Sequence, residues 1–242
     1  EMHADIRSRE CCLKSSKKAV ELAEKHQANL HILHITTKDE ISLFSNKPLN
    51  EKLITAEVCV PHLYFSKDDY EDKGTLIKCN PSIKEMSDRE ALRKALLEGY
   101  IDYVATDHAP HLLEGKSNDY MECPSGMPSI QHTLLVLLEL VREGVYSLKD
   151  LPYYLSHKVA DRFKIIDRGY IREGYWADLV LVDLDSPHSA SRENVSYFCG
   201  WSPFEGDTFN SKVVSTFVNG NLVYSEGRIL ESNQGVQLEF DR

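Results

Sequence analysis

The chain has 242 residues, 42% of them hydrophobic, and its 28 Lys and Arg against 38 Asp and Glu give a formal net charge of −10. This length corresponds to one or two domains with a sizeable core. The acidic balance argues against a nucleic-acid-binding module, which needs a basic face to neutralise phosphates. The longest apolar run, residues 134–140, is interrupted by Glu139 and is far below the roughly 18 residues of a membrane span. We therefore expect neither nucleic acid nor a membrane as a partner.

The first two thirds of the sequence alternate between helical and extended patterns. Apolar residues at helical spacing predict a helix over residues 9–26, and β-rich runs predict strands at residues 29–36 and 53–60. Ser87 and Glu90 match a capping box at the start of a helix that ends before Gly99. The other elements predicted here are a short helix at residues 37–44, a strand at 101–106, a loop at 114–129, and helices at 88–97, 130–142 and 148–163.

After residue 165 the helical periodicity gives way to short β-like runs, at residues 169–172, 178–183, 212–218 and 222–224. Asn219-Gly220 between two of these runs predicts a hairpin. The sequence therefore predicts an α/β region at residues 1–164 and a small β-rich segment at residues 165–242. Alternating helices and strands indicate a parallel sheet, open or closed into a barrel. Only three such strands are found, whereas a closed barrel needs eight.

Ligands of parallel sheets and barrels bind at the C-terminal ends of the strands. His34 ends the first predicted strand, residues 57–62 end the second, and Asp107 and His111 follow the third. Three neighbouring strands thus bring ionisable groups to one edge. His31 lies three residues from His34, so the two side chains should point to opposite faces of a strand.

Each of these residues also has an ordinary structural interpretation. His34 is also interpretable as a core histidine, and His62 as a loop histidine. Asp107 closes an apolar strand, where a carboxylate is costly to bury unless it meets a cation or acts as a general base. Alternatively, Asp107 caps a turn at Ala109-Pro110. His108 is expected to point back into the packing.

Two turns add polar groups beside these strand ends. Asn80-Pro81 offers an amide that both donates and accepts, and Pro124-Ser125-Gly126 exposes backbone groups suited to a planar ligand. By composition alone both segments are simply turns.

Residues 105–111, Ala-Thr-Asp-His-Ala-Pro-His, resemble the most specific motif of dihydroorotases, the cyclic-amide hydrolases of pyrimidine synthesis. Hydantoinases and allantoinases are similar at the strand positions but usually lack the Ala-Pro-His continuation. Further segments match in the family's order, at residues 3–10, 33–36, 55–62, 78–81, 88–91, 124–126, 177–183 and 201–206.

The resemblance implies the second half of an amidohydrolase-type (β/α)8 TIM barrel plus a small C-terminal β-sandwich segment. It implies one or two Zn²⁺ ions and attack of a metal-bound hydroxide on the ring amide, which interconverts dihydroorotate and N-carbamoyl-L-aspartate. His34 would be a zinc ligand, and Asp107 would both bind zinc and shuttle the proton to the leaving nitrogen. The implied substrate contacts are Asn80, His111, Ser125 and Gly126.

The sequence departs from the family at several ligands. No His-x-His occurs in the 242 residues, and the family's bridging carboxylated Lys or Asp, its fifth-strand His and its substrate-binding Arg are not found. Pro61-His62-Leu63 replaces the usual paired histidines. Together with the abrupt start at Glu1, this predicts the C-terminal portion of such an enzyme, from strand six onward. That portion alone should be inactive and prone to aggregate.

Two alternatives remain beside a dihydroorotase. One is a related cyclic amidase of the hydantoinase or allantoinase type, and the other is a non-catalytic scaffold. Beyond a small-molecule substrate, the expected partners are a second copy of the chain or other pyrimidine-pathway enzymes. The cysteines form no Cys-x-x-Cys pair and are typical of reduced thiols in a cytoplasmic protein; they are Cys11, Cys12, Cys59, Cys79, Cys123 and Cys199.

Overall fold

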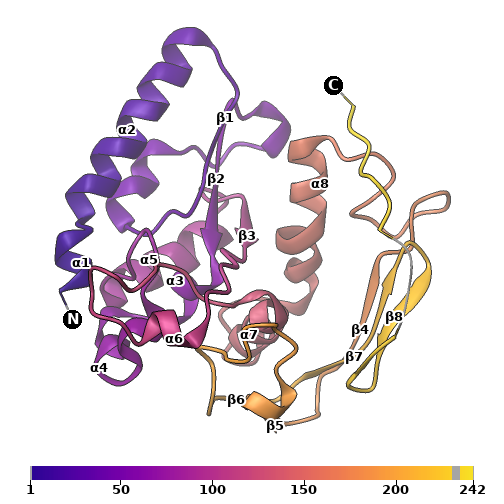
Figure 1. The fold of residues 1–242 in the computed structure, drawn as a ribbon. Helices are drawn as coiled ribbons and strands as arrows, with labels where there is room; N and C mark the ends of the chain where they lie inside the picture. The colour runs from indigo at the N-terminus through magenta and orange to yellow at the C-terminus, as the bar shows by residue number, and fades with distance from the viewer. Residues whose placement is uncertain (1, 231–234, 242) are drawn as a thin grey trace.

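A computed structural model describes residues 2–230 and 235–241. Its centre is a three-stranded parallel sheet in the order β1-β2-β3, formed by Leu30–Ile32, Ile54–Cys59 and Tyr103–Ala105 (Figure 1). Leu30 pairs with Ile54 across the first ladder, and Glu57 pairs with Tyr103 across the second. All three predicted parallel strands are confirmed, although β1 and β3 are only three residues long.

The helices that surround this sheet largely follow the predicted pattern. The predicted helices at residues 9–26 and 130–142 are confirmed to the residue as α2 and α7, and residues 38–43 form a 3₁₀ helix, η1. The helical segments in chain order are α1 His3–Ile6, α2 Arg9–His26, η1 Lys38–Leu43, η2 Leu49–Glu51, α3 Val60–Tyr64, η3 Lys67–Asp69, α4 Tyr70–Lys73, η4 Gly74–Ile77, α5 Met86–Leu97, α6 Leu113–Lys116, α7 Ile130–Arg142, η5 Leu148–Asp150, η6 Tyr153–His157, α8 Lys158–Phe163 and η7 Arg192–Asn194.

Two predicted helices differ in detail. The predicted start of α5 was wrong, because Glu85 rather than Ser87 precedes its first turn, and the Asp88 carboxylate accepts the Glu85 N–H at 3.2 Å. The single helix predicted at residues 148–163 consists of a 3₁₀ turn, a π-helical turn and α8. Pro152 itself is in helical conformation, with φ of −58° and ψ of −32°, and directly precedes the π-helical turn.

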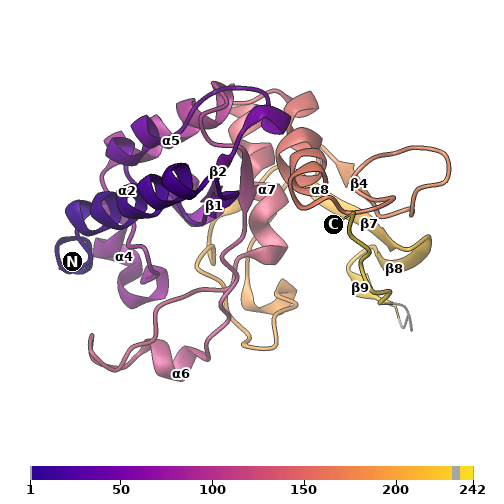
Figure 2. The same ribbon diagram turned by 90° about the horizontal axis from the view of Figure 1, so that it is seen from above.

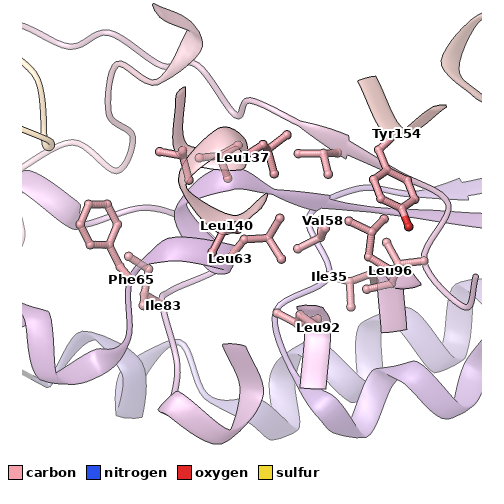
Figure 3. Close-up of a cluster of buried hydrophobic side chains, with 14 of the residues drawn as sticks. Ile35, Val58, Leu63, Phe65, Ile83, Leu92, Leu96, Leu137, Leu140 and Tyr154 are labelled. Carbon is pink, nitrogen blue, oxygen red and sulfur yellow. The ribbon is translucent and has the colours of Figure 1, made fainter. Parts of the chain in front are cut away.

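One apolar cluster joins the helices to the sheet. Leu92 and Leu96 of α5, Leu137 and Leu140 of α7, and Val58 of β2 all belong to it (Figure 3). Each such buried side chain contributes roughly 1.5–3 kcal/mol relative to an exposed one. The cluster also includes side chains from the C-terminal third, namely Ala190, Trp201, Phe204 and Phe209.

The C-terminal third contains two antiparallel sheets. Four strands pair in the order β4-β7-β8-β9, and β5 pairs with β6. Figures 1 and 2 place the four-stranded sheet on the opposite side of the molecule from α2. The bounds are β4 Leu179–Asp183, β5 His188–Ser189, β6 Thr208–Phe209, β7 Lys212–Val218, β8 Asn221–Ser225 and β9 Arg228–Ile229. Because β6 packs against α7, the chain between β4 and β7 returns to the main core. The division of the chain into two domains at residue 165 stays a prediction.

Of the turns and strands predicted for the C-terminal third, one hairpin is confirmed and one strand is not found. Asn219 and Gly220, with φ of 53° and 82°, form the predicted two-residue hairpin between β7 and β8. The strand predicted at residues 169–172 was wrong: Gly169 lies so close to α8 that a Cβ there would come within 2.4 Å of the Ala160 Cβ. No helix among residues 2–230 and 235–241 combines the length and apolar character needed to cross a membrane.

A buried ion pair fixes the N-terminal ends of β2 and β3. The Lys52 Nζ donates to Asp102 Oδ1 at 2.7 Å and to the Gly99 carbonyl at 2.7 Å, and the two charged side chains are 1% and 2% exposed. The second oxygen of Asp102 accepts the Ala56 N–H of β2 at 2.9 Å. Both charges are therefore hydrogen-bonded, which a buried pair requires.

We predict that Lys52→Met lowers the free energy of unfolding by about 3–5 kcal/mol, because it leaves the Asp102 carboxylate buried without its cation. Urea denaturation at pH 7 measures this loss. The control is Lys67→Met, since Lys67 pairs with Glu85 at a site where both side chains are 47% exposed; we expect a much smaller loss there, because solvent screens an exposed pair. Equal losses in the two variants would contradict the structural role of the Lys52 pair.

Candidate active site

Two strand ends carry residues in the left-handed backbone region. His34 lies two residues beyond β1 with φ of 58°, and Asp107 lies two residues beyond β3 with φ of 47°. Non-glycine residues rarely adopt this conformation, and its cost is typically found where function requires it. The two turns bring His34 Nε2 within 3.6 Å of Asp107 Oδ1. The structure thus brings together the two residues predicted to bind a metal.

Glu57 of β2 lies between these strand ends. Its Oε1 is 3.2 Å from Nδ1 of His34, and its Oε2 is 3.1 Å from Nε2 of His31. The expectation that His31 and His34 point to opposite faces was therefore wrong. The reason is that β1 ends at Ile32, and the left-handed turn at His34 breaks the alternation of the strand.

The carboxylate of Glu57 is held by a layer of buried polar groups. His31 stacks on Tyr103 with ring centroids 4.9 Å apart, the Tyr103 hydroxyl lies 2.7 Å from His31 Nε2, and Thr55 Oγ1 lies 2.9 Å from His31 Nδ1. Glu57 itself is only 6% exposed. Sequence reasoning did not single out Glu57, although a carboxylate inside an apolar strand signals a buried partner.

These contacts shift the protonation of the site. The hydrogen bond to Glu57 raises the pKa of His34, against the opposing effect of burial. Burial would raise the pKa of Glu57, but its hydrogen bonds to His31 and His34 outweigh that effect and lower it. Burial raises the pKa of Asp107 despite the nearby His34. Asp107 consequently holds a proton more readily than an exposed aspartate, as a proton-transferring carboxylate must.

His34 has possible metal-binding partners on both of its ring nitrogens. On the Nδ1 side, ligand atoms of His34, Glu57 and Cys59 lie within 4.8 Å of one another. Burial raises the pKa of Cys59 well above its ordinary value, so it remains a thiol rather than the thiolate that binds metals. Glu57 is already engaged by two imidazoles.

The opposite side of His34 fits a metal ion better. A ligating histidine usually donates its second N–H to a carboxylate, which is the relation of Nδ1 to Glu57. Nε2 then faces Asp107, whose oxygen is a second suitable donor. The donor set on this side therefore fits a divalent cation.

The predicted substrate-contacting residues lie on three segments that the backbone ties together. Ala109 N–H donates to the Met127 carbonyl at 3.0 Å, and Gly126 N–H donates to the Lys78 carbonyl at 2.8 Å. His111 Nε2 lies 3.1 Å from the Ser125 carbonyl. Residues 124–127 thus lie between the turn that follows Asp107 and the segment that leads to Asn80, whose side chain is exposed.

Gly126 is required by this close approach. Its φ is 134°, and a Cβ there would lie 2.5 Å from the Ala109 Cβ and 3.1 Å from His111 Cδ2. A larger residue would therefore push residues 124–127 away from the turn that carries His111.

The structure can be compared with the alternative roles that the sequence leaves open for His62, His108 and Asp107. His62 is buried, its Nε2–H donates to the Pro81 carbonyl at 2.9 Å, and burial lowers its pKa to about 3, so it is neutral. His108 does pack inward, and its Nδ1 accepts the Ser129 N–H at 3.0 Å. The turn after β3 is capped by Thr106, whose Oγ1 accepts the His108 N–H at 3.2 Å, rather than by Asp107.

The fold and site define a class, an α/β protein with a His and carboxylate centre at the C-terminal ends of parallel strands. The amidohydrolase family model matches residues 7–223, and the chain belongs to the amidohydrolase family.

Curated relatives refine this assignment. The dihydroorotase of Endomicrobium trichonymphae is 35% identical over 206 residues, which are 84% of this chain and 48% of that protein. The dihydroorotase of Bacillus subtilis (strain 168) is 32% identical over 211 residues, 87% of this chain and 49% of that protein. The chain thus spans about half the length of the curated relatives it matches.

Solved structures give the same picture of the fold. L-hydantoinase (dihydropyrimidinase) from Arthrobacter aurescens has a TM-score of 0.83 at 25% identity and covers 90% of this chain and 49% of its own. Dihydropyrimidinase from Brevibacillus agri NCHU1002 has a TM-score of 0.86 at 25% identity, with 94% and 51% covered.

We predict that Glu57→Gln lowers the pKa of His34 in the metal-free protein. The carboxylate stabilises the imidazolium form, which the neutral amide does not. NMR titration of the imidazole resonances measures the shift. Glu85→Gln, which changes a surface carboxylate, is the control and should leave His34 unchanged; an unaltered His34 pKa in Glu57→Gln would contradict the assigned contact.

Proposed function

We propose that this chain forms the second half of an amidohydrolase-type (β/α)8 barrel with its C-terminal β-rich segment, and that its site interconverts dihydroorotate and N-carbamoyl-L-aspartate in de novo pyrimidine biosynthesis. The observation that carries this proposal is the convergence of His34 and Asp107 at the ends of parallel strands. The dihydroorotase relatives favour this substrate over other cyclic amides. A cytoplasmic location is part of the proposal, and all six cysteines are free thiols.

In this proposal His34 and Asp107 bind zinc, as one or two ions, which would polarise the amide carbonyl and make a water molecule acidic enough to attack at neutral pH. Asp107 takes the proton from the attacking water and delivers it to the ring nitrogen as the C–N bond breaks. Glu57 holds His34 so that Nε2 faces Asp107.

We assign substrate recognition to the segments beside this pair. The Asn80 amide and His111 would contact the substrate, and the backbone at Ser125 and Gly126 would lie against its planar ring. The hydrogen bond from the Gly126 N–H to the Lys78 carbonyl supports this assignment, because it joins the segment of Ser125 and Gly126 to the segment that leads to Asn80. Association into a homodimer or with other enzymes of the pathway belongs to the same proposal.

A related cyclic amidase is the second candidate, because the solved neighbours named above are a hydantoinase and a dihydropyrimidinase. Turnover of hydantoin without turnover of dihydroorotate by the protein that contains this chain would favour it. The third candidate, a non-catalytic scaffold, would bind no zinc, so metal analysis of the same protein separates it from both enzymes.

We predict that Asp107→Asn lowers dihydroorotate turnover by about 10²–10⁴-fold, because the amide cannot accept the proton. Steady-state rates of the protein that contains this chain measure the loss. The matched control is Asp72→Asn, at an exposed position of α4, which should retain activity. Full activity of Asp107→Asn would refute the role assigned to Asp107.

A further inference from the structure

Lys116, at the end of α6, is a buried cation held by carbonyl groups. It is 1% exposed, and its Nζ donates to the carbonyl oxygens of Lys78 at 3.1 Å, Pro124 at 2.9 Å and Gly126 at 2.9 Å. An ammonium has three N–H donors, and all three are used. Across the described part of the chain no carboxylate pairs with it, so the carbonyls alone offset the cost of burying the charge.

The three carbonyls belong to the two segments that carry the proposed substrate contacts. Lys78 lies two residues before Asn80, while Pro124 and Gly126 flank Ser125. The Lys78 carbonyl also accepts the Gly126 N–H at 2.8 Å. One ammonium therefore fixes both segments relative to each other.

The same contacts orient the peptide that is to meet the substrate. In a trans peptide the C=O and N–H groups point in opposite directions. Because the Pro124 carbonyl points to Lys116, the Ser125 N–H points away from it. Within residues 2–230 and 235–241 no acceptor contacts that N–H, so it is available as a donor.

A second buried lysine holds another part of the same loop. Lys78 Nζ donates to the carbonyls of Tyr120 and Cys123, both at 2.6 Å, and lies 4.2 Å from the centre of the Tyr120 ring. It contacts neither of the carbonyls that flank Ser125. Lys78 thus supplies a matched comparison for Lys116: its buried ammonium holds the Tyr120 and Cys123 carbonyls of the same loop but not the carbonyls beside Ser125.

We propose that Lys116 is the positioning residue of the substrate pocket, which locks the Ser125 and Gly126 backbone against the segment of Asn80 through its three carbonyl contacts. This inference rests on the proposed function, since it names the group that arranges the recognition surface of that site. Lys116 does not touch the reacting atoms, so its loss should weaken substrate binding more than it slows the chemical step.

The charge of Lys116 offers a second readout. Burial lowers its pKa to about 8, with a further lowering from Lys78 and opposing effects from Cys123 and Cys79. Loss of the proton leaves two N–H donors for three carbonyls. KM should therefore rise above about pH 8 in the wild-type protein, and this rise should disappear when Lys116 is replaced.

The test compares Lys116→Met and Lys116→Gln with Lys78→Met in the protein that contains this chain. We expect both Lys116 variants to raise KM for dihydroorotate at least about tenfold with kcat nearly unchanged, as expected for lost binding geometry. Lys78→Met should raise KM clearly less. Hydrogen exchange of the Gly126 amide should accelerate in the Lys116 variants, because its bond to the Lys78 carbonyl depends on the same contacts.

Two results would overturn the inference: a KM that is unchanged in folded Lys116 variants, or an equal rise in Lys78→Met. If Lys116→Met is poorly active, the exchange measurement on Lys116→Gln decides the case, because the shorter glutamine side chain keeps two N–H donors. If the wild-type protein does not turn over dihydroorotate at all, the proposed function fails instead. Hydrogen exchange of the Gly126 amide then still reports on the contacts of Lys116 with the three carbonyls. Unchanged exchange in both Lys116 variants would refute the positioning role of Lys116.

Discussion

Glu57 lies in the middle of the sheet with one carboxylate oxygen toward His31 and the other toward His34. A buried carboxylate at this depth is stable only when hydrogen-bond donors meet both oxygens, and here each oxygen has an imidazole. His31 is fixed in turn by Thr55 of β2 and Tyr103 of β3. The orientation of His34, and with it the approach to Asp107, therefore depends on a contact that crosses all three strands.

Buried charged residues have different roles at the two ends of the parallel sheet. At the N-terminal ends, Lys52 and Asp102 satisfy each other together with backbone groups, and the result is a closed connection between strands. At the C-terminal ends, Glu57 satisfies one side of His34 and leaves the other side directed at Asp107. The Lys52–Asp102 pair uses its hydrogen-bonding groups within the fold and stabilises it. The imidazole of His34 uses only Nδ1 in this way, so the lone pair of Nε2 is left to bind a ligand beside Asp107. This division agrees with the general placement of ligand sites at the C-terminal ends of parallel strands.

Sequence patterns predicted the elements whose signals are local. The helical periodicity of residues 9–26 and 130–142 and the Asn219-Gly220 turn all gave the observed structure. Predictions failed where distant contacts decide the outcome. His31 and His34 share one side because a left-handed turn interrupts the strand, and Glu85 rather than Ser87 precedes α5 because Asp88 accepts its N–H.

The residues of the candidate site divide in the same way. His34 and Asp107 were predictable because strand ends are visible in the sequence, but Lys116 lies in a segment that the sequence predicts as a loop, where a lysine is ordinarily solvated. Its burial follows only from the folded path of residues 110–127, which brings three carbonyls around its ammonium. The two sets of residues also have different chemical roles in our proposal. A His and carboxylate pair suits hydrolysis of many cyclic amides, so in our proposal the segments that Lys116 holds together contribute to discrimination between dihydroorotate and a hydantoin.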